Sequence, residues 1–186
     1  MKILKWILGI LIVLALLFYF VGMPYLKEQT KKNSPEKTAT YTHNDLSLSV
    51  TYSSPFKKGR VIFGELVPYD KVWRTGANEP TIFVTETDIK FMGNNLPAGI
   101  YSLWTIPRKD NWSVILNKEI PGWGATIASA GSEATRNAEE DMLEVQVPTM
   151  VLPQSVESFT ISFDVDDQLY LSLYWDNTKV RVPINK

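Results

Sequence analysis

The sequence predicts an all-β domain, an antiparallel β-sandwich or barrel-like fold, placed after one amino-terminal transmembrane helix. A charge-free apolar run at residues 7–23 predicts the helix. Short segments that alternate apolar and polar residues follow from residue 46 onward, and turn-forming Gly, Pro, Asn and Asp separate them. Helical and extended patterns do not alternate, so a parallel sheet is not favoured.

Composition divides the 186 residues into a transmembrane anchor or uncleaved signal (1–24), a polar tether (25–40) and a β-rich domain (41–186). The domain holds 13 basic and 18 acidic residues, and this excess of acid argues against nucleic-acid binding. Cysteine is absent, which excludes disulfides, thiol nucleophiles and zinc–cysteine sites. The single histidine, His43, excludes a histidine-rich metal site.

The apolar run at residues 7–23 would span about 25 Å as a helix, which is just enough for a bilayer core. No small-x-small pattern follows it, so an uncleaved anchor is favoured over a cleaved signal. Lysines after the run favour a cytoplasmic domain, whereas the layout of the amino terminus favours export. We expect a membrane-anchored domain on the extracytoplasmic side.

Strands are expected in the alternating segments, with the hairpin of residues 100–106 and 112–117 at the centre of the sheet. An acidic turn, Asp164–Asp167, should join a second hairpin. Residues 126–141 are small, polar and acidic, and would form one short helix or a long loop. The expected strands are 46–53, 81–86, 89–92, 100–106, 112–117, 142–147, 158–163, 169–175 and 178–183.

Residues 54–80 form the densest run of turn formers, aromatic residues and charges in the chain. Within it, Trp73 offers a flat apolar face and Arg74 a rigid fork of donors suited to carboxylate or phosphate. Asn78 can donate and accept hydrogen bonds, and Glu79 can accept them or act as an acid. This combination suits a small polar or carbohydrate-like ligand.

A second aromatic, Trp123, would extend such a site if it lies near Trp73. The alternative is structural: Arg74 pairs internally with Glu65, Asp70 or Glu79, and Trp73 only caps the core. The full set of candidate ligand-binding residues is Arg60, Glu65, Trp73, Arg74, Asn78, Glu79 and Trp123.

Catalytic signals are weak, because the chain contains no nucleophile elbow and no phosphate-binding glycine loop. Glu65 and Glu79 are the acids that a glycan hydrolase would place across a cleft. Asp164, Asp166 and Asp167 resemble a fragment of a calcium loop but lack its glycine and distal glutamate. We therefore expect no metal, no cofactor and no catalytic residue.

Three strings, KGRVIFGELVPYDKVWRTGANE, LPAGIYSLWTIP and WSVILNKEIPGWGA, resemble a bacterial family of uncharacterised proteins, the DUF2911 domain family. The resemblance covers roughly residues 45–184 and implies a β-rich exported domain with a signal or anchor, but no function. Its motif positions in this chain are Gly59, Arg60, Phe63, Gly64, Leu66, Trp73, Arg74, Gly76, Ala77, Asn78 and Glu79.

The sequence thus predicts a non-enzymatic, membrane-anchored envelope domain. It would bind a small polar or carbohydrate-like ligand, or a protein partner, through the loop of residues 60–79, and the membrane through residues 7–23. The alternatives are an extracytoplasmic glycan hydrolase using Glu65 and Glu79, and a purely structural domain.

Overall fold

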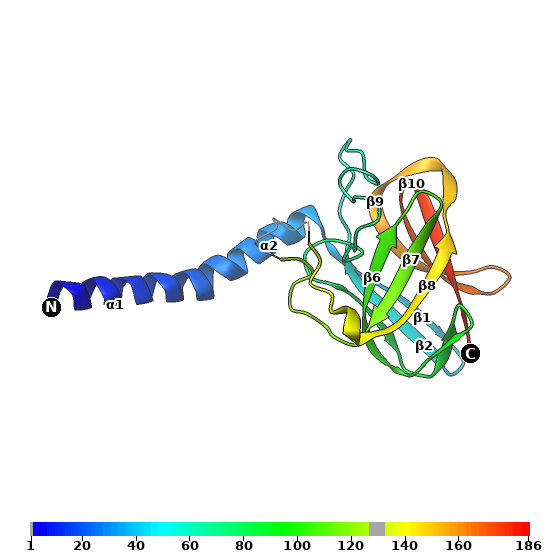
Figure 1. Ribbon diagram of the computed structural model, residues 1–186, viewed down its shortest axis with the longest axis horizontal. Helices are drawn as coiled ribbons and strands as arrows, with labels where there is room; N and C mark the ends of the chain where they lie inside the picture. The colour runs from blue at the N-terminus through cyan, green and yellow to red at the C-terminus, as the bar shows by residue number, and fades with distance from the viewer. Residues whose placement is uncertain (1, 127–132) are drawn as a thin grey trace. The chain divides into compact units, whose positions relative to one another are not determined.

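The computed structural model describes residues 2–126 and 133–186, which fall into two compact units, Met1–Asn33 and Ser34–Lys186. The first unit is helical throughout (Figure 1). It comprises helix α1 (Lys2–Leu17), a π-helical turn (Phe18–Gly22) and helix α2 (Met23–Asn33). The π-helical turn lies just before Pro24, whose ring removes a backbone donor.

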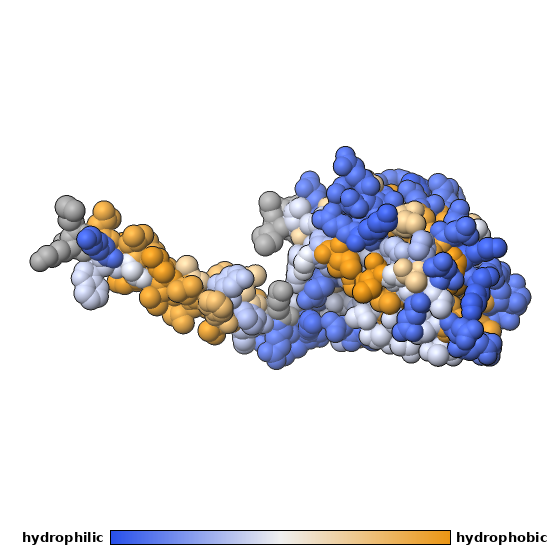
Figure 2. Space-filling model, turned by 90° about the horizontal axis from the view of Figure 1, so that it is seen from below, coloured by the Kyte–Doolittle hydropathy of each residue, from blue (hydrophilic) through white to orange (hydrophobic). Residues whose placement is uncertain are grey.

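The helical segment Leu4–Asn33 contains an 18-residue window with a mean hydropathy of 2.6, which is apolar enough to cross a membrane. Apolar residues cover most of its length in the space-filling view (Figure 2). This confirms the predicted amino-terminal apolar helix. Residues 25–33, which we assigned to a polar tether, continue the helix because Lys, Glu and Gln favour helix.

The second unit contains two antiparallel sheets that do not close into a barrel, which confirms the predicted sandwich. The larger sheet has the order β1-β2-β3-β6-β7-β8 and the smaller sheet the order β5-β4-β10-β9 (Figure 1). Their bounds are β1 (Glu36–His43), β2 (Leu46–Ser53), β3 (Thr81–Thr85), β4 (Ile89–Phe91), β5 (Asn94–Leu96), β6 (Gly99–Pro107), β7 (Asn111–Asn117), β8 (Asp141–Pro148), β9 (Met150–Val165) and β10 (Leu169–Asn185).

Strand β1 starts inside the segment predicted as a tether. Its residues alternate threonine with Ala39 and Tyr41, and β-branched residues favour strands. Every β1 residue from Glu36 to His43 pairs with β2. The regular domain therefore begins near residue 36 rather than residue 41.

The core lies between the two sheets. The predicted central hairpin is confirmed as β6–β7, an inner pair of the larger sheet. Its Leu103 and Val114 are fully buried, as are Phe159 and Leu171 from the smaller sheet. Burying such a side chain contributes about 1.5–3 kcal/mol, so this layer supplies much of the stability of the domain.

The last two strands are longer than the alternating segments indicated. β10 unites the segments predicted as 169–175 and 178–183, and it is irregular at Asp176, where φ is +50°. The chain direction reverses there, as two contacts across the bend show. The ammonium of Lys179 lies 5.4 Å from the Tyr174 ring centre, and the guanidinium of Arg181 lies 3.7 Å from the Tyr170 ring centre. The acidic turn between β9 and β10 is confirmed.

The first half of β9 lies along the residues of β10 that form this reversal. Met150 pairs with Lys179, Val156 with Asp176 and Thr160 with Tyr174, so β9 follows the chain around the bend. Of residues 126–141, the described part contains one short 3₁₀ turn (Ala138–Glu140), and residues 127–132 lie outside the described chain.

Candidate functional site

The motif of residues 73–79 is anchored by Trp73. Its backbone N–H donates to the Thr105 carbonyl at 2.7 Å, and the Thr105 N–H donates back at 3.0 Å, which ties the motif to β6. Its indole Nε1–H donates to the Gly76 carbonyl at 3.0 Å. Its ring contacts four others, with centres 4.9–6.2 Å away: Phe63, Trp112, Phe159 and Trp175. Trp73 is therefore the part of the motif that packs against the core.

The backbone after this anchor is strained. Thr75 and Asn78 have φ of +56° and +58°, and a β-branched residue such as Thr75 rarely adopts that conformation. Each such residue costs about 1–3 kcal/mol. The surroundings hold Thr75 in place: its hydroxyl bonds the Thr105 hydroxyl at 3.1 Å, and its carbonyl accepts from the Thr81 hydroxyl at 2.6 Å. Backbone strain of this kind concentrates at functional sites.

Unlike Thr75, the motif residues Arg74, Asn78 and Glu79 carry side-chain polar atoms without described partners. Within residues 2–126 and 133–186, Arg74 makes no hydrogen bond or ion pair. Burial lowers the pKa of its guanidinium, although an arginine remains charged at any physiological pH. Asn78 is only 7 % exposed. Its Nδ2 and the Oε2 of Glu79 are buried without a hydrogen-bond partner in the described structure.

Gly124 brings Arg74 and Asn78 together. A β-carbon at residue 124 would lie 2.7 Å from Cδ of Arg74, so the stem of the arginine packs directly on this glycine. The Gly124 N–H also donates to the Asn78 carbonyl at 3.4 Å. The loop that carries Gly124 thus lies against both residues. Arg74 is a half-buried cation without a described partner, and the buried, unpaired donor of Asn78 and acceptor of Glu79 are costly. A ligand that paired with these groups would relieve that cost.

The acids expected to pair with Arg74 lie elsewhere or stay unpaired. Asp70 accepts from Arg108 Nε at 3.0 Å. Glu65 lies exposed in the turn before Val67. Glu79 keeps one buried oxygen unpaired. In the described part of the chain, Arg74 is therefore not an ion-paired staple.

The two remaining candidates close local turns. Arg60 is exposed, and its guanidinium donates to the carbonyls of Lys57 at 3.0 Å and Phe56 at 2.6 Å. Trp123 is partly buried, and its carbonyl accepts from the Thr135 hydroxyl at 2.6 Å. The described ring contacts of Trp73 do not include Trp123.

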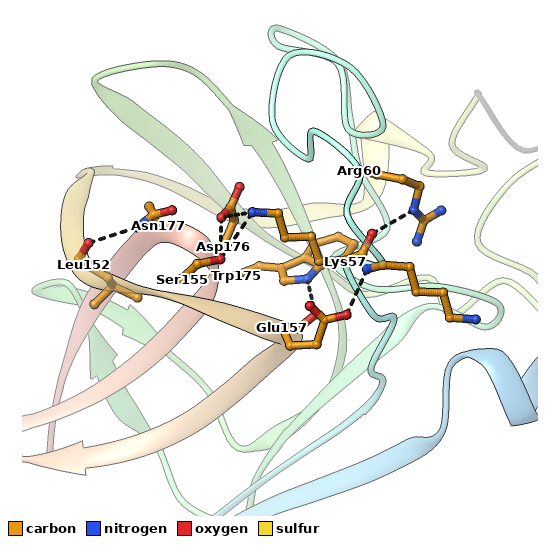
Figure 3. A network of polar contacts seen from close by, with 9 residues as sticks. Lys57, Arg60, Leu152, Ser155, Glu157, Trp175, Asp176 and Asn177 are labelled. Carbon is orange, nitrogen blue, oxygen red and sulfur yellow. Dashed lines mark hydrogen bonds and ion pairs between the residues drawn. The ribbon is translucent and has the colours of Figure 1, made fainter.

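Sequence reasoning missed a polar network at the tip of β10 (Figure 3). Lys57 Nζ lies 2.5 Å from Asp176 Oδ1 and 3.2 Å from Ser155 Oγ, and Ser155 donates to the same carboxylate oxygen at 2.7 Å. Glu157 Oε1 accepts from the Lys58 N–H, and the Glu157 carbonyl accepts from the Trp175 indole. The only sequence signal was the Asp-Asn pair, which is typical of turns.

This network stabilises the fold and lacks the properties of a nucleophilic site. Lys57 is ion-paired with Asp176, so it has no free lone pair with which to activate Ser155. Burial alone would raise the pKa of Asp176. Hydrogen bonds from Lys57 and Ser155 and the charge of Lys57 outweigh that effect and lower the pKa.

The acidic turn is likewise internally paired. Asp164 lies 2.8 Å from Lys179 Nζ, Asp166 lies 3.4 Å from Arg181, and Asp167 accepts from the Tyr170 hydroxyl at 3.0 Å. Across residues 2–126 and 133–186, no group of three or more His, Asp or Glu side chains is arranged to hold a metal ion.

A model of the family described as "Protein of unknown function (DUF2911)" matches residues 34–184. The match covers the second compact unit except its last two residues. No curated protein and no solved structure matches the chain.

Proposed function

The chain belongs to the DUF2911 family of proteins of unknown function, and we propose that it is a membrane-anchored domain that binds a small polar, carbohydrate-like ligand. The ligand would lie against Arg74, Asn78 and Glu79, with Gly124 supporting the arginine stem. Trp73 would position the motif from the core side. The globular domain would face the extracytoplasmic side, following the helix at the start of the chain.

One observation carries this proposal: Asn78 and Glu79 each bury a polar atom without a partner, and the half-buried Arg74 beside them in the motif has no described ion pair. Native proteins pair nearly all of their buried polar groups, so exceptions call for an explanation. The strained φ angles at Thr75 and Asn78 support the same interpretation, because the fold holds this segment in an unfavourable conformation.

A protein partner is the second candidate, favoured by two exposed apolar side chains on the preceding loop. Val61 is 54 % exposed and Leu66 is 43 % exposed. A partner that covers them would also reach the motif of residues 73–79. The glycan-hydrolase alternative has less support. Its proposed second acid, Glu65, is exposed, whereas catalytic acids commonly lie in apolar surroundings.

The test uses the full chain in detergent and a panel of neutral and charged monosaccharides, with binding measured by calorimetry. We expect at least one sugar to bind the wild type, and Arg74→Gln and Asn78→Ala to weaken that binding at least tenfold. Lys71→Gln is the matched control, because Lys71 is exposed and three residues from Arg74. Equal binding by all four proteins would contradict the proposed site.

A further inference from the structure

We infer that the ligand is a sugar acid: it carries one carboxylate, held by Arg74, and hydroxyl groups that reach Asn78 and Glu79. This inference rests on the proposed binding site and specifies its chemistry.

The charge of the site requires an anion. Arg74 is a permanent cation, and in the described residues it has no carboxylate within ion-pair distance. Its stem is fixed on Gly124, which limits the positions its guanidinium can take. A partly desolvated cation attracts an anionic group more strongly than a solvated one, because the local dielectric is lower.

Carboxylate fits this site better than phosphate. The guanidinium fork matches either group in a bidentate arrangement. A phosphate monoester, however, carries about −1.5 to −2 charges at neutral pH, and Arg74 would neutralise only one of them. The excess would lie beside Glu79, in a domain with 13 basic and 18 acidic residues. A single carboxylate leaves no such excess.

The two other unpaired atoms require a ligand with both hydrogen-bonding functions. Asn78 Nδ2 is a donor and Glu79 Oε2 is an acceptor when ionised, and both are buried without partners. A neighbouring hydroxyl can accept from the amide and donate to the carboxylate. Sugar acids present several hydroxyls within a few ångströms of one carboxylate, so one molecule can satisfy all three residues.

The test compares three probes that differ at one carbon: D-glucuronate, D-glucose and D-glucose 6-phosphate, with D-galacturonate and D-galactose as a second pair. Affinities are measured by calorimetry on the full chain in detergent. We expect a uronate to bind at least tenfold tighter than its neutral sugar and tighter than the phosphate. Arg74→Gln should remove that preference, and Lys71→Gln should keep it.

The outcomes separate the two proposals. Equal affinity for charged and neutral sugars, weakened by Asn78→Ala, would overturn the sugar-acid inference and leave the binding site standing. Tightest binding of the 6-phosphate would overturn the choice of carboxylate. If no probe binds the wild type at tens of millimolar, the inference is wrong and the proposed site loses its support as well. A melting curve of each variant checks that the protein is folded.

Discussion

Gly124 lies against the side chain of Arg74 so closely that a β-carbon at residue 124 would come within 2.7 Å of Cδ and 2.9 Å of Cβ. Both distances are shorter than real β-carbon contacts allow. The glycine therefore determines where the arginine stem lies, although the two residues are far apart in sequence.

Gly124→Ala should displace Arg74 and weaken binding of D-glucuronate at least tenfold. Gly122→Ala is the control, because nothing lies within 4 Å of the β-carbon it would add. Calorimetry on both variants gives the comparison. Unchanged affinity in Gly124→Ala would show that the position of the stem does not matter for binding.

Arg74→Met should leave the free energy of unfolding unchanged or raise it. The substitution removes a partly buried charge that has no described partner and keeps an apolar stem of similar length. Arg136→Met is the contrasting variant, since Arg136 lies 2.8 Å from Asp141 with both side chains mostly buried.

We expect Arg136→Met to lose about 1.5–3 kcal/mol, the range for hydrogen bonds to charged groups. Urea unfolding of the full chain measures both values. A loss of that size in Arg74→Met would instead support the structural alternative, in which Arg74 fastens the loop to the sheet.

Gly76→Ala should destabilise the domain by about 2–5 kcal/mol. Gly76 has φ of +147°, and an added β-carbon would lie 2.7 Å from the Ser53 carbonyl oxygen. The cost combines backbone strain of about 1–2 kcal/mol with overpacking of about 1–3 kcal/mol. Gly93→Ala separates the two contributions, because its φ of +80° is also positive but nothing lies within 4 Å. Thermal unfolding should show a clearly smaller loss for Gly93→Ala.

Stability should fall in acid partly through Asp176. Its pKa is lower in the folded protein than in the unfolded chain, because bonds from Lys57 and Ser155 outweigh the effect of burial. Its contribution is therefore fully present above the unfolded value of about 3.9 and disappears as the pH falls through the folded value.

Asp176→Asn should lower stability at pH 7 by about 1–2 kcal/mol and flatten the decline below about pH 4. Asp45→Asn is the control, because that side chain is 85 % exposed. Urea midpoints between pH 2 and 7 would reveal the difference. Parallel curves for wild type and Asp176→Asn would contradict this role for Asp176.

Most strands could be predicted because a half-buried strand shows a period of two, as in β2 (Leu46–Ser53) and residues 158–163 of β9. β1 (Glu36–His43) could not be predicted, since this edge strand is mostly exposed and Ala39 and Tyr41 are the only apolar residues in its alternation. Its position follows from pairing with β2. The first half of β9 escaped prediction for a similar reason: its shape follows the reversal at Asp176.

The motif could be located from sequence, because Arg74, Asn78 and Glu79 fall within six consecutive residues. The groups that surround each of these side chains could not be predicted from the sequence. Trp73 contacts Phe159 and Trp175, which come from the other sheet and are distant in sequence. Which side chains lie close enough to pair with Arg74 likewise depends on how distant parts of the chain pack together.

The part of β10 that follows the reversal pairs with β4, and this pairing affects the order in which the domain folds. β4 (Ile89–Phe91) pairs with Ile184 and Asn185, which lie about 90 residues later in the sequence. The smaller sheet therefore cannot be completed until residues 184 and 185 have been synthesised. Contacts that distant in sequence also slow folding. A chain that ends at Asn177 would leave the fully buried Phe91 without its neighbouring strand. Closure of the smaller sheet is therefore a late step of folding, because it joins two parts of the chain that are far apart in sequence.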